Sequence, residues 1–260
     1  MRPWERNAAN LAASLSFYGP VSFTPGLRLI TSRVAYSVFN IALLDSPVSE
    51  PYGPMGGELE RRIEAAAAHY RSRNRPWSFW ICESFLGPHN SRRLLRIFEA
   101  CGLQCIAESP GMEAEDFPPL KRRLPELEYR PVSDAATRAD FAGIVSQCFH
   151  IPPAVADLVY DSEADFHAPL EIWMGYHEGQ AITSAAVIHA ADAIGIYSVA
   201  TLPLWRGQGL AEAVMRHAVN DVRRRGGAGP LVLQSSPSGY ELYRRLGFRR
   251  VTRYFVFATN

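Results

Sequence analysis

The sequence is poor in lysine and cysteine and carries almost no net charge. Lys121 is its only lysine, and the formal net charge is +1. This balance gives no global field that would draw the chain to nucleic acid, and the arginine clusters are not interleaved with stacking aromatic residues. The four cysteines show neither a CxxC redox pair nor metal-ligand spacing: Cys82, Cys101, Cys105 and Cys148. We therefore expect no nucleic-acid partner and no metal.

The sequence also lacks a long hydrophobic run. No segment approaches the length that spans a bilayer, and residues 1–20 lack the continuous apolar core of a signal peptide. We therefore expect a cytoplasmic protein with no membrane partner. Its 260 residues, 47% hydrophobic and 20% charged, are typical of one large or two ordinary soluble domains.

A proline-rich, charged segment between residues 110 and 131 is typical of a domain boundary. We place the joint near residues 115–126 and predict domains at 1–120 and 127–260. Hydrophobic periodicity in the second domain predicts the order β-α-α-β-β-β-α-β-α-β, with Asp134 capping the first helix. Strands are expected at 127–130, 171–176, 180–190, 193–202, 231–234 and 252–258, and helices at 134–149, 153–161, 209–225 and 239–245. The fold class is α/β of the α+β type, with a mixed, mainly antiparallel sheet flanked by helices.

The first half repeats the end of this order loosely. A helix at 58–73, a strand at 77–82, a helix at 91–101 and a strand at 104–107 follow one another. Aligning Gly102 with Gly247 places Phe98 on Tyr243, and Gly57 corresponds to Gly209 if the first half carries a modest insertion around residues 85–90. Either an internal duplication or chance explains these matches.

The loop at residues 206–209, Arg-Gly-Gln-Gly, precedes a helix and predicts an anion site. A helix N-terminus offers unpaired N–H groups and partial positive charge, glycines allow close approach, and Arg206 adds donors. A Walker loop is excluded because Leu210-Ala211 stands where Lys-Ser/Thr is needed. A dinucleotide fingerprint is disfavoured because Glu212 occupies the third glycine position. For the two glycines alone, a tight turn into the helix remains the alternative.

Two segments around this loop extend the pattern. SVATLPLWRGQGLA (198–211) and LQSSPSGYELYRRLGFRRV (233–251) resemble the acyl-CoA-binding and C-terminal motifs of the GNAT superfamily of N-acetyltransferases. The resemblance implies two tandem GNAT-like domains with acetyl-CoA as co-substrate. Backbone groups of Val199 and Thr201 would hold the pantetheine and acyl portion. The pyrophosphate would lie on the amides of Arg206, Gly207, Gln208, Gly209, Leu210 and Ala211. Ser236 would either contact the coenzyme or cap the following helix.

The resemblance also implies direct acyl transfer to an amine. The Val199 N–H would stabilise the oxyanion, and Tyr243 would protonate the departing thiolate or else serve as a core aromatic. Many relatives carry a glutamate on the strand expected at 193–202, where this sequence offers only Tyr197. His177, His189, Asp192 and Glu171 near strand ends are more typical of turn or surface residues. We therefore assign no general base.

The first half lacks these groups. Its counterpart of the loop, residues 54–58, reads Pro-Met-Gly-Gly-Glu, which has no arginine and puts an acid at the helix start. Phe98 cannot donate a proton. We expect a degenerate GNAT-like or accessory domain there.

Two functions remain open from the sequence. One is an N-acetyltransferase whose acceptor is a small-molecule or peptide amine, and the other is a non-catalytic acyl-CoA sensor. The aromatic C-terminal strand, with Phe255 and Phe257 on one face, suggests a sheet edge through which a homodimer would form.

Overall fold

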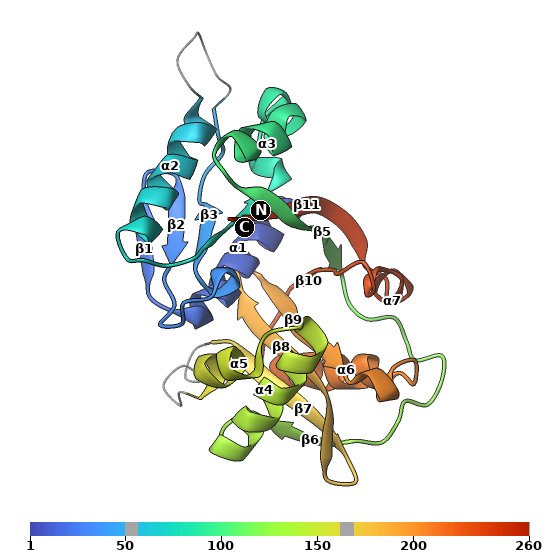
Figure 1. Cartoon of the computed structure of the whole chain (residues 1–260). Helices are drawn as coiled ribbons and strands as arrows, with labels where there is room; N and C mark the ends of the chain where they lie inside the picture. The colour runs from blue at the N-terminus through green and yellow to red at the C-terminus, as the bar shows by residue number, and fades with distance from the viewer. Residues whose placement is uncertain (50–56, 162–168, 260) are drawn as a thin grey trace. The chain divides into compact units, whose positions relative to one another are not determined.

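The computed structural model describes residues 1–49, 57–161 and 169–259. It contains two compact units that are discontinuous along the chain (Figure 1). Unit 1 comprises Met1–Phe17, Glu113–Leu233 and Glu241–Arg249; unit 2 comprises Tyr18–Met112, Gln234–Tyr240 and Arg250–Asn260. The chain thus enters each unit more than once, and the division into domains 1–120 and 127–260 stays a prediction.

Unit 1 is built on a mainly antiparallel sheet in the order β10-β9-β8-β7-β6. Strands β6 to β9 pair antiparallel, and β10 runs parallel to β9. The strands are β6 (Glu128–Pro131), β7 (Glu171–His177), β8 (Gln180–Ala190), β9 (Ala193–Thr201) and β10 (Leu231–Gln234). Two-residue turns with positive φ at both positions, Glu178-Gly179 and Ala191-Asp192, match the right-handed twist of the hairpins. The three adjacent antiparallel strands β7–β9 confirm the sequence prediction.

Helices flank this sheet. They are α1 (Pro3–Leu15), α4 (Ala135–Phe149), α5 (Pro153–Tyr160), α6 (Leu210–Arg224) and the short α7 (Tyr240–Arg245). The Asp134 side chain accepts the Thr137 N–H at 2.8 Å, which confirms the predicted N-cap. Helix α6 buries a stripe that includes Val214, Ala218 and Val222 against the strands. Helix α1, which the sequence analysis did not predict, also belongs to this unit.

Unit 2 has strands in the order β1-β2-β3-β4-β11-β5 with helices α2 (Glu58–Arg71) and α3 (Pro88–Ala100). The strands are β1 (Val21–Thr24), β2 (Leu27–Ile30), β3 (Ile41–Leu44), β4 (Ser78–Cys82), β5 (Gln104–Ala114) and β11 (Arg249–Ala258). Strand β5 is longer than predicted because it continues through Pro110. That residue has no N–H to donate, but its carbonyl accepts the Ser235 N–H at 3.0 Å.

Aromatic packing in unit 2 corrects one expectation. Strand β11 lies between β4 and β5, so it is not a sheet edge. Phe257 is fully buried and stacks on Phe98 with ring centroids 3.8 Å apart, and Phe255 belongs to the same core. The aromatic residues of β11 therefore form a core, and the homodimer stays a prediction without this support.

Some features of the described residues bear on binding. No helix among them combines the length and apolar character needed to cross a bilayer. Within residues 1–49, 57–161 and 169–259, no three His, Cys, Asp or Glu side chains gather as a metal site. All four cysteines are free thiols.

Candidate acyl-CoA site

A β-bulge interrupts the pairing of β9 with β8. Ser184 pairs with Ala200 and Ala186 with Tyr197, so Ser198 and Val199 together face the single residue Ala185. Ser198 has φ +47°, a left-handed conformation that is uncommon for residues other than glycine. This is the geometry of an extra residue inserted into one strand.

The bulge changes which residues of β9 face each neighbouring strand. Before it, the Ile194 N–H donates to Pro230 O beside β10; after it, the Leu202 N–H donates to Ile182 O of β8. Because backbone groups alternate along a strand, the N–H and C=O groups of Val199 and Thr201 point away from β8. They face the side on which β10 pairs with the first part of β9. The parallel pairing of β10 with β9 ends at Val232↔Gly195. In the described chain, the β9 edge at Val199 and Thr201 is therefore left without a strand partner.

Side chains already reach the end of this edge. The Thr201 carbonyl accepts from Arg206 Nε at 3.1 Å and lies 3.5 Å from the Cys148 Sγ donor. Burial raises the pKa of the Cys148 thiol, so it stays neutral near pH 7. Arg206 is thus anchored through Nε at the end of β9, which leaves its terminal nitrogens for other acceptors.

The loop before α6 presents a run of unpaired amides. The Arg206 N–H donates to Pro203 O at 3.3 Å, but no acceptor among the described residues binds the amides from Gly207 to Ala211. Gly207 and Gly209 have φ values of +79° and +89°, and Gly209 is the helix N-cap. A Cβ at Gly207 would meet nothing within 4 Å, so the backbone is open to close approach. The predicted loop residues thus form one surface of unpaired amides at the start of α6, beside which Arg206 presents its side chain and not its amide.

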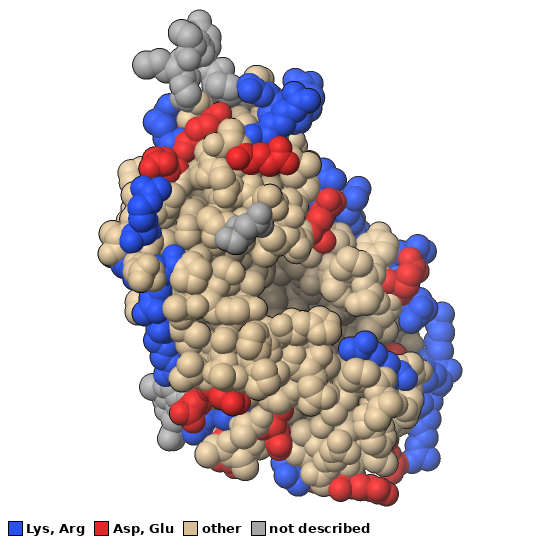
Figure 2. Space-filling model, viewed as in Figure 1, with Lys and Arg blue, Asp and Glu red and all other residues tan. Residues whose placement is uncertain are grey.

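Arg122 completes this surface and was missed by sequence reasoning. A Cβ built on Gly209 would lie 2.4 Å from Arg122 Nη2, so the guanidinium covers the helix N-cap. The linker that carries it is held on α6 because Arg216 donates to Pro118 O at 2.7 Å and lies over the Phe117 ring. Figure 2 shows basic side chains along this linker edge. No periodicity in the linker sequence pointed to this placement.

Tyr243 lies on α7 and is 8% exposed. Its ring packs edge-on against Phe248 with centroids 5.8 Å apart, and the Phe248 N–H donates to its carbonyl at 3.0 Å. Gly247 makes this bend with φ +87°. Burial raises the pKa of the Tyr243 hydroxyl, so it stays protonated at neutral pH. No protein partner of that hydroxyl is found in the described ranges, and the structure thus allows either predicted role.

Ser236 belongs to unit 2 and closes a local turn. Its Oγ accepts the Gly239 N–H at 3.2 Å and lies 3.1 Å from Ser238 Oγ. The hydroxyl thus provides an acceptor for a backbone N–H just before α7, as a capping residue does. Its contact with a coenzyme stays a prediction.

The acidic and histidine residues near the strand ends have local roles. Glu171 pairs with Arg225 at 2.6 Å, and His189 Nε2 lies 3.0 Å from Ala228 O. Asp192 is in the hairpin turn. The His177 ring packs against Trp205 at 5.0 Å. These contacts account for Glu171, His177 and His189 without catalysis.

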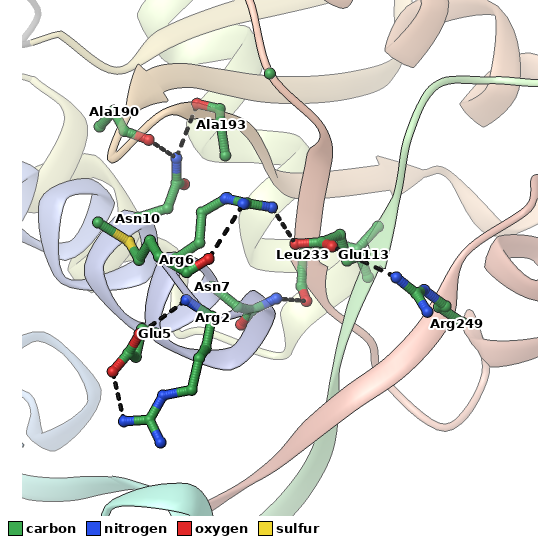
Figure 3. A network of polar contacts seen from close by, with 12 residues as sticks. Arg2, Glu5, Arg6, Asn7, Asn10, Glu113, Ala190, Ala193, Leu233 and Arg249 are labelled. Carbon is green, nitrogen blue, oxygen red and sulfur yellow. Dashed lines mark hydrogen bonds and ion pairs between the residues drawn. The ribbon is translucent and has the colours of Figure 1, made fainter. Parts of the chain in front are cut away.

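Helix α1 contributes a polar network that reaches Ala190 and Ala193, at either side of the β8–β9 turn (Figure 3). Asn10 Nδ2 donates to Ala190 O at 2.7 Å and to Ala193 O at 3.2 Å. The Tyr197 hydroxyl donates to Asn10 Oδ1 at 2.6 Å, and burial raises its pKa. Further along the helix, Asn7 Nδ2 donates to Leu233 O at 3.2 Å, and Arg6 pairs with the buried Glu113 at 2.9 Å. The sequence offered no signal for contacts between residues so distant in the chain.

Unit 2 repeats part of this architecture. Strands β3 and β4 pair in parallel from Ile41↔Ser78 to Leu43↔Trp80, and a further parallel bridge joins Val48 to Leu86. At the start of α2, the Glu58 carboxylate accepts the Ser49 N–H at 2.9 Å. Residues 54–56 of the predicted counterpart loop lie outside the described residues.

Buried Arg62 fills the space beside these segments. It is 7% exposed and donates to the carbonyls of Gly26, Ser46 and Pro47 at 2.8–3.1 Å, and it pairs with Glu58. The chain's own groups thus bind one another beside the start of α2. Gly57 also has φ −66°, unlike its counterpart Gly209. These features agree with a degenerate repeat.

Known proteins share this fold and part of the sequence. Residues 168–250 match the acetyltransferase (GNAT) domain family. A GCN5-related N-acetyltransferase from Kribbella flavida is similar over 97% of this chain and 95% of its own, with 20% identity and a TM-score of 0.70. One from Sphaerobacter thermophilus is similar over 90% and 76%, with 17% identity and a TM-score of 0.57. A tandem GNAT protein from the clavulanic acid biosynthesis pathway covers 98% and 93%, with 13% identity and a TM-score of 0.58. No curated protein sequence matches the chain.

These identities are low, so the structural likeness establishes the fold of both halves, which is GNAT-like and tandem. The sequence match is narrower, and it contains the β9 bulge, the α6 loop and Tyr243. Residues 168–250 therefore match the acetyltransferase (GNAT) domain family, within a chain whose whole fold is similar to tandem GNAT structures.

Proposed function

We propose that the protein is an acetyl-CoA-dependent N-acetyltransferase that transfers the acyl group directly from the thioester to an amine in unit 1. The observation that carries the proposal is the pairing of two open backbone surfaces in one unit. The amides of Gly207–Ala211 lack acceptors in the described chain, and the β9 edge at Val199 and Thr201 lacks a strand partner. The first suits a pyrophosphate and the second suits an extended pantetheine amide chain.

Each residue has a defined part in this proposal. The amides of Gly207–Ala211, with Arg206 and Arg122, bind the pyrophosphate, and Val199 and Thr201 pair with the pantetheine. The Val199 N–H donates to the oxyanion that forms when a neutral amine attacks the carbonyl. Tyr243 gives its proton to the departing thiolate, so that coenzyme A leaves as a thiol. The amine loses one proton to solvent, and Tyr243 regains one from solvent, which balances the reaction.

The acceptor is an amine that enters unprotonated. No carboxylate is assigned as the base, because β9 itself carries none, Glu171 of β7 is paired with Arg225, and Asp192 lies in the hairpin turn before β9, at the opposite end of the strand from Val199. Water is therefore the proton acceptor in this proposal. The rate should rise with pH as the free amine of the acceptor becomes more abundant.

A non-catalytic acyl-CoA sensor is the second candidate. The missing base favours this candidate: β9 carries no carboxylate in the position where many relatives have one. Both candidates predict acetyl-CoA binding, and only the enzyme predicts consumption of the thioester.

The deciding experiment follows free thiol released from acetyl-CoA across a panel of amines. Tyr243→Phe should keep acetyl-CoA affinity and lose on the order of 10²-fold in kcat, as expected for removal of a general acid. Tyr240→Phe on the same helix is the matched control and should retain activity. Thiol release that is absent from wild type with every amine, together with normal acetyl-CoA binding, would favour the sensor.

A further inference from the structure

We propose that Asn10 and Ser184 are positioning residues for acyl transfer, because together they hold the β9 bulge that turns the Val199 N–H toward the acyl group. This inference rests on the proposed function, since it assigns these residues to the oxyanion donor of that reaction. Neither residue touches the substrates. Both are fully buried in unit 1.

Asn10 anchors the strand on the N-terminal side of the bulge. Its Nδ2 is held between the carbonyls of Ala190 and Ala193, so Oδ1 must be the atom that faces Tyr197. The Tyr197 hydroxyl donates to that oxygen at 2.6 Å. Gly195 leaves the required space, because a Cβ there would lie 1.9 Å from Oδ1. Tyr197 is thus fixed from helix α1 immediately before the bulged residue.

Ser184 anchors the strand at the bulge itself. Its Oγ donates to Ser198 O at 2.9 Å, and Ser198 is the residue with φ +47°. A serine in the left-handed region is strained relative to extended backbone, so it persists only where surrounding contacts hold it. The Ser184 hydroxyl supplies such a contact from the neighbouring strand.

Loss of the anchors would alter the direction of the oxyanion donor. Backbone groups in a strand alternate with a period of two, and the extra residue at Ser198 shifts that alternation by one. If the bulge relaxed to regular pairing, the Val199 N–H would turn toward β8 and away from the open edge. Asn10 and Ser184 thus act on the reaction through the backbone of Ser198 and Val199.

The test compares each positioning residue with a matched buried residue of unit 2. Asn40 is fully buried, donates from Nδ2 to Val34 O and Tyr36 O, and accepts the Ser32 N–H on Oδ1. Ser78 is fully buried and donates from Oγ to Ser37 O. Asn10→Ala is therefore compared with Asn40→Ala, and Ser184→Ala with Ser78→Ala, all in the full chain.

The measurements are kcat, the KM for acetyl-CoA and the Kd for acetyl-CoA of folded protein. We expect kcat to fall about 10- to 100-fold in Asn10→Ala and Ser184→Ala, because a misdirected donor loses part of its effect. KM and Kd for acetyl-CoA should stay within about threefold, since the α6 loop is untouched. Asn40→Ala and Ser78→Ala should keep kcat within about twofold. Should Asn10→Ala fail to fold, Ser184→Ala and Tyr197→Phe carry the same expectation.

Two results would overturn the inference alone: full kcat in the variants of an active enzyme, or an equal loss of kcat in the unit 2 controls. Wild-type protein that binds acetyl-CoA but acetylates no amine would overturn the proposed function, and this inference with it. The two failures are therefore distinguishable by the behaviour of wild type.

Discussion

The hydroxyl of Tyr197 on β9 donates a hydrogen bond to Asn10 on α1, with 2.6 Å between the two oxygens and 187 positions between the residues. This contact, with the other bonds of Asn10, places the first helix of the chain inside the unit that carries the α6 loop. A protein cut at a single linker position would separate α1 from that unit. The N-terminal helix is therefore part of unit 1, which carries the α6 loop, and not of unit 2.

Gly195 tests this arrangement directly. A Cβ there would lie 1.9 Å from Asn10 Oδ1 and 2.5 Å from Tyr197 Cε2, so Gly195→Ala should destabilise the protein by about 1–3 kcal/mol through overpacking. Gly143→Ala on α4 is the control, because a Cβ there meets nothing within 4 Å. Alanine should stabilise that helix by about 0.5–1 kcal/mol. Chemical denaturation measures both, and equal stability of the two variants would contradict the described packing.

A substitution at Arg62 tests whether this residue stabilises unit 2 without taking part in acetyl-CoA binding. Arg62→Met removes the donors to Gly26 O, Ser46 O and Pro47 O from a buried side chain and leaves Glu58 without its ion-pair partner, which should cost about 1–3 kcal/mol. Acetyl-CoA affinity should not change. Arg71→Met is the control: its ion pair with Glu64 is 72% exposed on both sides and should contribute little. A loss of acetyl-CoA affinity in Arg62→Met would show that unit 2 also takes part in coenzyme binding.

Local signals predicted the elements that local contacts determine. Helix α4 followed from Asp134 and α6 from its apolar spacing, and both lie where the sequence placed them within one or two residues. Strands β7–β9 followed from alternation and turn residues. Gly207 and Gly209 have positive φ values in the loop that the sequence placed before the helix.

Features set by distant contacts escaped sequence reasoning. The alternation of β11 suggested an edge, yet its aromatic residues complete a core with Phe98, more than 150 positions earlier. The bulge was not predicted because serine gives no local signal for a left-handed conformation, and Ser198 is held by Ser184 from the next strand. Arg122 reaches Gly209 only because the linker is held on α6 by Arg216.

His217 should make stability depend on pH. It stacks on Tyr129 with centroids 3.9 Å apart and packs edge-on against Trp173, and this burial lowers its pKa below the ordinary value. Arg224 lowers the pKa further and Asp221 opposes it. The native state therefore binds fewer protons than the unfolded state. The contribution of this residue to the unfolding free energy is present above about pH 6.5 and is lost as the pH falls below that value.

His217→Phe keeps the aromatic stack but cannot be protonated. Between pH 7.5 and pH 5, the unfolding free energy of this variant should fall less than that of wild type. Urea denaturation at a series of pH values measures the difference. Parallel curves for the two proteins would contradict a lowered pKa at His217.

The central claim is that one acyl-CoA site exists, at the α6 loop of unit 1, and a calorimetric titration with acetyl-CoA tests it most directly. We predict one site per chain in wild type and none in Gly209→Glu, where an acidic side chain would enter the anion surface. Gly226→Glu is the matched control, because Gly226 has a similar φ of +91° at the other end of α6 and should keep the site. Two sites per chain, no binding to wild type, or full affinity in Gly209→Glu would contradict this account.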